Sequence, residues 1–354
     1  MAHEMGKLDT AFYGSNTPAW HGLGLVVAGQ PTSKDALHLS GLDWQVDKEP
    51  AFFGDGSGFI QAPDCFFTVR MDLARNDPRR VLGQVGAKYN PIQNADCFSV
   101  MDALVDQAGM KFETAGSLFN GKVVYLLGVL PDHLQVKGDV TKKYLLATTS
   151  HDGTKALRIL FTPVRVVCNN TLTLALSRLS RNNVAIRHTS NFKEAIEDAK
   201  IVLGLSNEYF DLQNITMQKL ADIRVDKVFV DAYLKALIPQ PKKDDGTDGN
   251  GKRAEKVRNR ISTLFFGGQI GADGEAVKGT AYGLFNAVTE YIDHERSTKK
   301  TKRITNAAES RMNSVFFGSG SMMREKAGSL LMRQLGIGKA PAEETPMEAM
   351  VSAN

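Results

Sequence analysis

The spacing of apolar residues changes near the middle of the chain. Between about residues 45 and 167, apolar and β-branched residues form short runs separated by Gly, Pro, Asn and Asp, which is typical of strands joined by turns. From residue 172 to about residue 336 they recur every three or four positions, which is typical of amphipathic helices. The sequence therefore predicts an α+β protein. An antiparallel β-sheet core with one crossing helix is expected in the first half, and a mainly helical region in the second.

The stretch of residues 144–176 contains the change of period. Two apolar runs, 144–149 and 156–167, flank Asp152-Gly153, and an Asp-Gly pair supplies the positive φ that a tight hairpin turn needs. Pro163 interrupts the second run and has no N–H to donate, so it predicts a bulge or a sheet edge at that point.

The end of this hairpin brings polar residues to the start of a predicted helix. Arg165, Asn169 and Asn170 follow the second strand, and the helix is expected to begin at Leu172. Free amides and the positive end of the helix dipole favour an anion such as phosphate at a helix N-terminus. We expect a phosphate contact here.

The remaining elements follow from the same two periods. Further strands are predicted at residues 44–53, 59–61, 65–71, 81–87, 111–118 and 123–130. A first helix is predicted at residues 33–39, with Thr32 or Ser33 as its cap, and a second at 94–108, with Asn94 as its cap and Gly109 ending it. Further helices are predicted at residues 172–179, 192–205, 226–238, 254–266, 281–296, 307–317 and 322–335.

These elements suggest four regions along the chain. Residues 1–44 form an N-terminal arm with a short helix, and residues 45–171 form the antiparallel sheet domain. Residues 172–336 form a basic helical region, interrupted at 239–252 by a flexible loop without apolar residues beyond its prolines and glycines, and 337–354 form a disordered tail.

Composition narrows the class of protein. The 354 residues are 42% hydrophobic, no stretch approaches the roughly 20 apolar residues of a membrane span, and no signal-peptide order begins the chain. We therefore expect a protein of the cytoplasm with no membrane contact. The three cysteines share no C-x-x-C spacing, which favours reduced thiols over disulfides or zinc.

The charge is divided unequally along the chain. Residues 1–140 carry 11 Lys and Arg against 16 Asp and Glu, a net −5, whereas residues 141–354 carry 32 against 23, a net +9. A polyanion would meet the second part first.

Two basic clusters stand out in the positive part. Lys252, Lys256 and Arg260 lie at i, i+4 and i+8, with Arg253 beside them, which places a stripe of positive charge on one helical face. The second cluster follows His294 and consists of Arg296, Lys299, Lys300, Lys302 and Arg303. Each cluster taken alone is equally well explained as a solvated face, but together they favour a nucleic-acid surface, to which Arg187 and His188 are added.

Motifs for catalysis are weak. The seven histidines match no metal spacing and the chain has no phosphate-binding loop of the G-x-x-x-x-G-K-[ST] kind, so no metal and no cofactor is expected. The alternative is a pocket that gathers Cys168, His188, Asp293 and His294 and acts on nucleic acid or nucleotides. At the end of an apolar strand, Cys168 is more typical of a small buried hydrophobe than of a nucleophile.

Several ordered segments resemble a known family. TPAWHGLGLVV, SGLDWQV, VGAKYNPIQN, ETAGSLFNGKVVYLL, SHDGTKALRILFTPVRVVCNNTL, IRHT and GTAYGLFNAVTEYIDHER are similar to the phage/plasmid-like proteins of domain-of-unknown-function family 932. The resemblance covers about residues 12–336 and implies a phage or plasmid product without implying an activity. One departure is Tyr282, where a Trp is expected in similar proteins.

A second resemblance is topological. A curved antiparallel sheet crossed by a helix and followed by basic helices is similar to phage single-strand annealing proteins, which form rings or filaments on DNA; this is an analogy of fold. We therefore expect a non-enzymatic protein that binds or anneals single-stranded DNA in recombination or replication, as a homo-oligomer. Tyr89, Tyr282 or Phe285 would stack on bases. The rivals are the enzyme above and a counter-defence protein that binds a host protein.

Overall fold

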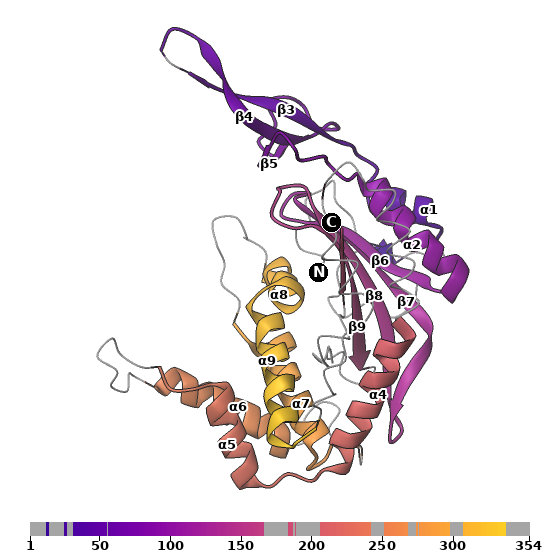
Figure 1. Cartoon of the computed structure of the whole chain (residues 1–354), viewed down its shortest axis with the longest axis vertical. Coiled ribbons are helices and arrows are strands. Elements are labelled where there is room, and N and C mark those ends of the chain that lie inside the picture. Colours follow the sequence, from indigo (N-terminus) through magenta and orange to yellow (C-terminus); the bar gives the residue numbers. More distant parts are fainter. Residues whose placement is uncertain are drawn as a thin grey trace, which may run out of the picture.

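The computed structural model describes residues 12–13, 25–26, 31–54, 56–165, 183–186, 188, 206–241, 251–267, 274, 276–297 and 307–337. They form an elongated, curved molecule, with a β-hairpin at one end, a large sheet in the middle and a group of helices at the other end (Figure 1). Antiparallel sheets fill the first half and helices dominate the second, so the predicted α+β class is confirmed. None of the helices in these stretches is long and apolar enough to cross a membrane.

The N-terminal part contains a short strand pair and one helix. Strands β1 (Phe12–Tyr13) and β2 (Leu25–Val26) pair in parallel. Helix α1 (Ser33–Leu39) begins after Thr32, whose hydroxyl accepts a hydrogen bond from the Asp35 amide while the Asp35 carboxylate accepts one from the Thr32 amide. This reciprocal pair satisfies two amides at the helix start, so the predicted Thr32 cap is confirmed.

The hairpin at the end of the molecule belongs to a three-stranded antiparallel sheet, β3 (Val46–Gly54), β4 (Phe59–Arg70) and β5 (Val81–Gly86). The predicted separation of residues 59–61 from 65–71 is wrong, because β4 is continuous. A register shift opposite Ala51 lets the strand pass Pro63 and Asp64, and Asp64 takes a φ of +50°. Strand β5 pairs only with residues 65–69, so it covers the base of the hairpin and not its tip.

The main sheet is antiparallel and has the strand order β10-β9-β8-β7-β6. Its strands are β6 (Lys111–Leu118), β7 (Val123–Val136), β8 (Asp139–Ser150), β9 (Leu157–Arg165) and β10 (Asn183–Ile186). The predicted turn after β6 is confirmed, since Asn120 and Gly121 both have positive φ. Lys137 and Gly138 form a second such turn between β7 and β8.

The β8–β9 hairpin forms as predicted, with Gly153 at a φ of +76°. Pro163 lies opposite Lys143 in regular register. Strand β10 pairs only with residues 157–160, so within the described part of the sheet Pro163 lies on an uncovered edge, where a missing N–H is tolerated. Strand β10 itself falls in the half predicted to be helical, which is a correction; Val184 and Ile186 are β-branched and alternate as in a strand.

Helix α2 (Asn94–Ala108) crosses the sheet and ends before Gly109, whose φ of +62° confirms the predicted stop. The predicted Asn94 cap is wrong by one residue. Gln93 precedes the helix, and its backbone amide donates to the Asp96 carboxylate at 3.0 Å. The Asn94 side chain is buried and donates instead to the Leu42 carbonyl at 2.9 Å, so it is not available as a cap.

The second half contains α4 (Ser206–Asp222), α5 (Lys227–Leu237), α6 (Lys252–Gly267), α7 (Ala281–Glu290), the π-helical turn η1 (Tyr291–Glu295), α8 (Ala307–Phe317) and α9 (Ser319–Gln334). Helices α5 to α9 confirm the predicted helices within a few residues, except that 281–296 ends in the π-helical turn. The predicted helices at 172–179 and 192–205 lie outside the described residues. Helix α4 was not predicted, because buried Gln213 and exposed Leu212 and Ile215 obscure its apolar period.

Both faces of the main sheet are apolar. On one face, Val124 and Leu126 join a core with α1 and α2; on the other, Tyr125 and Leu127 join a core with α8. A third core fills the space between α4, α5, α6, α7 and α9. The Tyr282 hydroxyl of α7 donates to the Asp139 carboxylate of β8 at 2.7 Å, which ties the helices to the sheet.

Candidate nucleic-acid interface

Five of the predicted nucleic-acid-binding residues have described side chains: His188, Lys252, Arg253, Lys256 and Arg260. The backbone of Arg165 ends β9 opposite Thr141. The other predicted residues lie outside the described residues: Asn169, Asn170, Arg187, Lys299, Lys300, Lys302 and Arg303, together with Cys168 of the rival pocket.

Helix α6 carries the first basic cluster on its exposed face. Ile261, Leu264 and Phe265 are buried against the helical core and fix which side of the helix faces solvent. The start of the helix exposes three cations, which we call the α6 cations: Lys252, Arg253 and Lys256. The Arg258 guanidinium donates to the Ile238 carbonyl at 2.8 Å, which holds the start of α6 against the end of α5.

Arg260 differs from the α6 cations because it already has an anionic partner. Its guanidinium donates two hydrogen bonds to the Glu295 carboxylate, with 2.6 Å between Nε and Oε2. This bidentate pair lowers the pKa of Glu295 and raises that of Arg260. The charge of Arg260 is therefore largely neutralised before any ligand arrives.

The π-helical turn η1 follows α7 and is fixed on a second side by a buried ion pair. The Arg324 guanidinium of α9 donates to the Asp293 carboxylate at 2.8 Å, and both side chains are almost fully buried. Beyond the turn, the Arg296 guanidinium donates to the hydroxyls of Ser314 at 3.1 Å and Ser319 at 2.9 Å. A π-helical turn shifts the following residues relative to an α-helix, and such turns occur often at functional sites.

A pocket of about 400 Å³ lies where α5, α6, η1 and α9 meet, and we call it the helical pocket. Leu237, Ile238, Val257 and Met323 give it an apolar wall. Its polar lining residues are Arg253, Tyr291, Arg296 and Ser297. Burial raises the pKa of Tyr291, so this hydroxyl is neutral at physiological pH.

The aromatic residues expected to stack on bases do not support that role. Tyr282 and Phe285 are completely buried in the helical core, so the expectation for these two is wrong. Tyr89 already stacks on the His188 ring, with 4.7 Å between ring centroids, and its hydroxyl donates to the Ser150 carbonyl at 3.0 Å. These contacts give Tyr89 a structural role.

His188 belongs to a buried polar cluster at the base of the β3–β4 hairpin. Its Nε2 lies 3.2 Å from the Thr149 hydroxyl, and its Nδ1 accepts a hydrogen bond from the Ile92 amide at 3.4 Å. Trp44 contributes an edge contact to His151, at 5.4 Å between centroids, and carries the Arg70 guanidinium over its ring. Residues from four of the segments that resemble the family therefore meet here: Trp44 of SGLDWQV, Tyr89 and Ile92 of VGAKYNPIQN, His151 of SHDGT and His188 of IRHT.

The hydrogen bonds of Asn94 determine which ring nitrogen of His151 carries the proton. The Asn94 amide nitrogen donates to backbone carbonyls, so its oxygen faces His151 Nε2 at 2.8 Å and accepts a hydrogen bond from the N–H at that position. Complete burial lowers the pKa of His151 to about 3, so the ring is neutral at physiological pH. A neutral, enclosed ring of this kind is typical of a structural histidine.

The residues of the rival catalytic pocket divide between two places. His188 lies in the cluster beside Tyr89 and Thr149, whereas Asp293 lies among the helices and pairs with Arg324. No group of three or more His, Cys, Asp and Glu side chains suitable for a metal ion occurs in the part of the chain that the structure describes.

Sequence reasoning missed Tyr291 and Arg324 as residues of this region. A regular α-helix through residues 281–296 predicts the wrong direction for the Tyr291 side chain. The π-helical turn contains one residue more than an α-helical turn, which rotates the residues within and after it. Arg324 lies in a helix whose apolar pattern is weak, and no pattern along the chain links it to Asp293. The bonds that hold Arg296 beside the helical pocket are likewise invisible in the sequence.

Fold and surface together define an α+β protein with two antiparallel sheets and a helical region that carries a cationic helix beside a pocket. A family model described as domain of unknown function (DUF932) matches residues 81–316, which is more than half of the chain. The chain belongs to this family. No curated protein and no solved structure matches it.

Proposed function

We propose that the protein binds nucleic acid through the exposed face of α6. The observation that carries this proposal is the exposure of three cations, Lys252, Arg253 and Lys256, close together at the start of α6. Side chains of this kind neutralise phosphates and release bound counterions, which supplies most of the affinity for a nucleic-acid backbone.

Single-stranded DNA is the ligand that we propose. The support is the resemblance of the topology to phage single-strand annealing proteins, together with the phage or plasmid setting implied by the family segments. In this proposal the protein acts in recombination or replication in the host cytoplasm, and the backbone contacts position the strand without reading its sequence. The proposal also includes Lys299, Lys300, Lys302 and Arg303 of the second basic cluster as phosphate contacts.

The test is a binding titration against single-stranded DNA, double-stranded DNA and RNA at two salt concentrations, with and without magnesium. Each phosphate contact on a single strand contributes about −0.7 to the slope of log K against log salt. A triple variant, Lys252→Ala with Arg253→Ala and Lys256→Ala, should therefore flatten the slope by about 2. Alanine preserves the helix because it is the best helix former.

The matched control removes the same charge elsewhere. Lys219, Lys227 and Lys235 are exposed on α4 and α5, so their triple alanine variant lowers the net charge equally. It should leave the slope nearly unchanged. A wild-type protein that binds none of the three nucleic acids at about 50 mM salt, where phosphate contacts are strongest, overturns the proposal. A protein partner then becomes the better explanation of the surface.

A further inference from the structure

We propose that the protein associates head to tail, with the tip of the β3–β4 hairpin of one copy docked in the helical pocket of the next. This inference goes beyond the proposed nucleic-acid binding and does not depend on it. It rests on an exposed apolar tip, a pocket of matching size and charge, and the positions of the two in the molecule.

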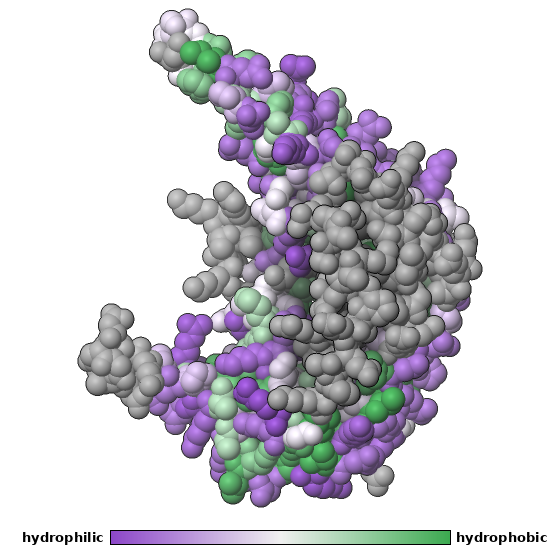
Figure 2. Space-filling model, in the orientation of Figure 1, coloured by the Kyte–Doolittle hydropathy of each residue, from purple (hydrophilic) through white to green (hydrophobic). Residues whose placement is uncertain are grey.

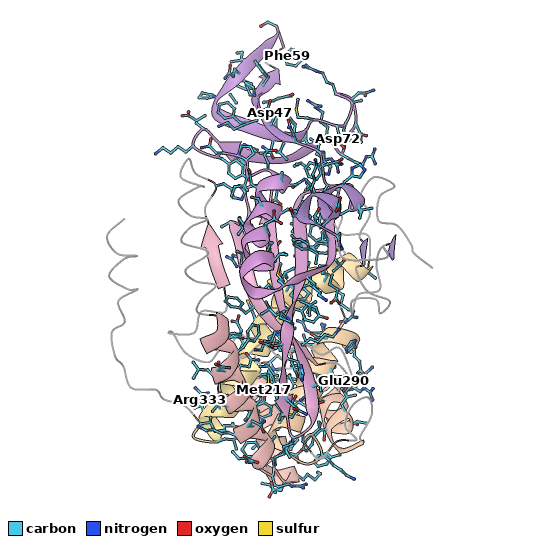
Figure 3. All side chains as sticks on the ribbon, turned by 90° about the vertical axis from the view of Figure 1, so that its right-hand side faces the viewer. Asp47, Phe59, Asp72, Met217, Glu290 and Arg333 are labelled. Carbon is cyan, nitrogen blue, oxygen red and sulfur yellow. The ribbon has the colours of Figure 1, made fainter. Side chains whose placement is uncertain are left out.

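The hairpin tip exposes large apolar side chains that are normally buried. Phe59 is 84% exposed, Phe52 56%, Phe53 51% and Ile60 47%. Phe53 lies opposite Ile60, and Phe52 is one position away on the other face, so both faces of the hairpin are apolar. Figure 2 shows this hydrophobic tip at the end of the molecule, and Figure 3 places Phe59 at its far point.

No other element of the described part of the chain covers this tip. Strand β5 pairs with residues 65–69 only, so it supports the base of the hairpin and leaves the tip projecting (Figure 1). Helices α5 and α6, which line the helical pocket, lie at the end of the molecule opposite to the β3–β4 hairpin in Figure 1, so the hairpin does not reach the pocket of its own chain. A contiguous apolar patch of this kind marks an interaction site.

Charge distinguishes a second copy from other occupants. Residues 51–64 contain Asp55 and Asp64 and no lysine or arginine, while Glu49, nearer the base of the hairpin, is paired with Arg80. The helical pocket is lined by two cationic residues, Arg253 and Arg296, and no carboxylate belongs to the described residues that line it. An acidic, aromatic tip is therefore complementary to a cationic, apolar pocket, since guanidinium groups attract both carboxylates and aromatic faces.

The dimensions of the pocket also match. A volume of about 400 Å³ is within the range of sites that enclose a ligand of several rings or one to two aromatic side chains. Leu237, Ile238, Val257 and Met323 offer the apolar wall that such rings need. Phe59 and one of its phenylalanine neighbours would be enclosed there.

The assembly that follows is open at both ends. Each copy offers one tip and one pocket on different surfaces, so the contact is heterologous and repeats until a ring closes or a filament grows. The carboxylates of the hairpin would meet cations next to the α6 face, so chains of copies would place successive α6 cations along one assembly.

The test uses two variants with complementary defects. Phe53→Ser with Phe59→Ser removes the tip, and Ala254→Trp fills the helical pocket without changing any charge. Each variant should be monomeric by sedimentation velocity without nucleic acid, with self-association weakened about tenfold or more, as for a buried aromatic anchor. Mixing the two should give a one-to-one dimer, because one partner retains the tip and the other the pocket.

Matched controls keep surface chemistry constant. Val228→Ser removes an apolar side chain that is 77% exposed on α5, and Asn259→Trp adds a tryptophan to the exposed side of α6. Both should associate like the wild type. Circular dichroism checks that the variants are folded. If Ala254→Trp does not fold, the tip variant still tests the proposal, because Phe53 and Phe59 are exposed and their substitution leaves the core unchanged.

Three outcomes overturn the proposal. A wild-type protein that is monomeric at about 0.1 mM has no such interface, since even a micromolar Kd would be visible there. An Ala254→Trp variant that still associates by itself, while the tip variant is monomeric, indicates that two tips pair with each other. If the tip variant associates like the wild type, the tip does not mediate self-association and binds another partner, such as a host protein. Nucleic-acid affinity is measured separately, because neither variant removes a cation.

Discussion

The Asp293 carboxylate lies 2.8 Å from the Arg324 guanidinium, and the two side chains are 3% and 4% exposed. This buried pair joins the π-helical turn to α9. Glu295, two residues further on, is joined to α6 by Arg260. The turn is therefore held from two sides, and this fixes Tyr291 and Arg296 at the helical pocket.

The buried pair should be essential for stability. Arg324→Met leaves the Asp293 carboxylate buried without its guanidinium partner, which costs about 3–5 kcal/mol. The free energy of unfolding from urea denaturation measures the loss. The matched control is Arg333→Met on the exposed side of the same helix, which should change stability by less than about 0.5 kcal/mol. Equal effects of the two substitutions would contradict a structural role for the pair.

Gly83 should be irreplaceable at the base of the hairpin. A Cβ at this position would lie 2.4 Å from the Asp152 backbone Cα, because β5 approaches the β8–β9 turn closely. Gly83→Ala should therefore destabilise the protein by about 1–3 kcal/mol. Gly86 lies in the same strand and its Cβ would meet no atom within 4 Å, so Gly86→Ala serves as control and should stay within about 1 kcal/mol. Thermal unfolding of both variants measures whether only Gly83→Ala loses stability.

His151 should make the stability depend on pH in the acid range. Its folded-state pKa of about 3 lies below the ordinary value of 6.5, so the unfolded chain takes up the proton first as the pH falls. The stability that neutral His151 contributes is complete above about pH 6.5 and is lost between 6.5 and 3, at up to about 1.4 kcal/mol per pH unit. His188, whose pKa burial also lowers, acts in the same direction.

Urea denaturation at several pH values between 7.5 and 5 tests this dependence. A His151→Gln variant should lose part of the acid sensitivity of the wild type. His38→Gln is the control, because His38 is exposed and pairs only with Asp43 at the surface. If wild type and His151→Gln lose stability in parallel as the pH falls, His151 is not the titrating group.

The strands and helices that were predicted correctly have local causes. Gly109 and Gly153 stop or turn the chain with positive φ, and Thr32 caps its helix with Asp35 three residues away. Such signals lie within a few residues of one another, so a single sequence contains them. The prediction of Asn94 as a cap was wrong for the opposite reason. Its side chain forms hydrogen bonds with Leu42 and His151, both more than 50 positions away along the chain.

The candidate site depends even more on distant residues. The exposed α6 cations follow from the period of one helix, and they could be predicted. The neutralisation of Arg260 by Glu295 joins residues 35 positions apart, and the helical pocket needs four elements to meet. Burial of Tyr282 and Phe285 likewise depends on packing of α7 against several helices, so the sequence placed them on a binding surface wrongly.

Lys256 and Arg260 provide the sharpest test of the proposed nucleic-acid surface, because they lie one turn apart on the same helix and differ in their partners. Lys256 is exposed, whereas Arg260 donates both of its hydrogen bonds to Glu295. Lys256→Ala should reduce the salt slope for single-stranded DNA by about 0.7, the contribution of one phosphate contact. Arg260→Ala should leave the slope nearly unchanged.

A second measurement shows whether the Arg260 substitution has acted as intended. Because Arg260 lowers the pKa of Glu295, its removal should return that pKa towards 4.5, which NMR titration of the Glu295 carboxyl can follow. A raised Glu295 pKa with an unchanged slope means that Arg260 is a structural residue and that the phosphates meet the start of α6. If Arg260→Ala flattens the slope as much as Lys256→Ala does, the ion pair opens when the strand binds, and Arg260 then joins the α6 cations as a phosphate contact.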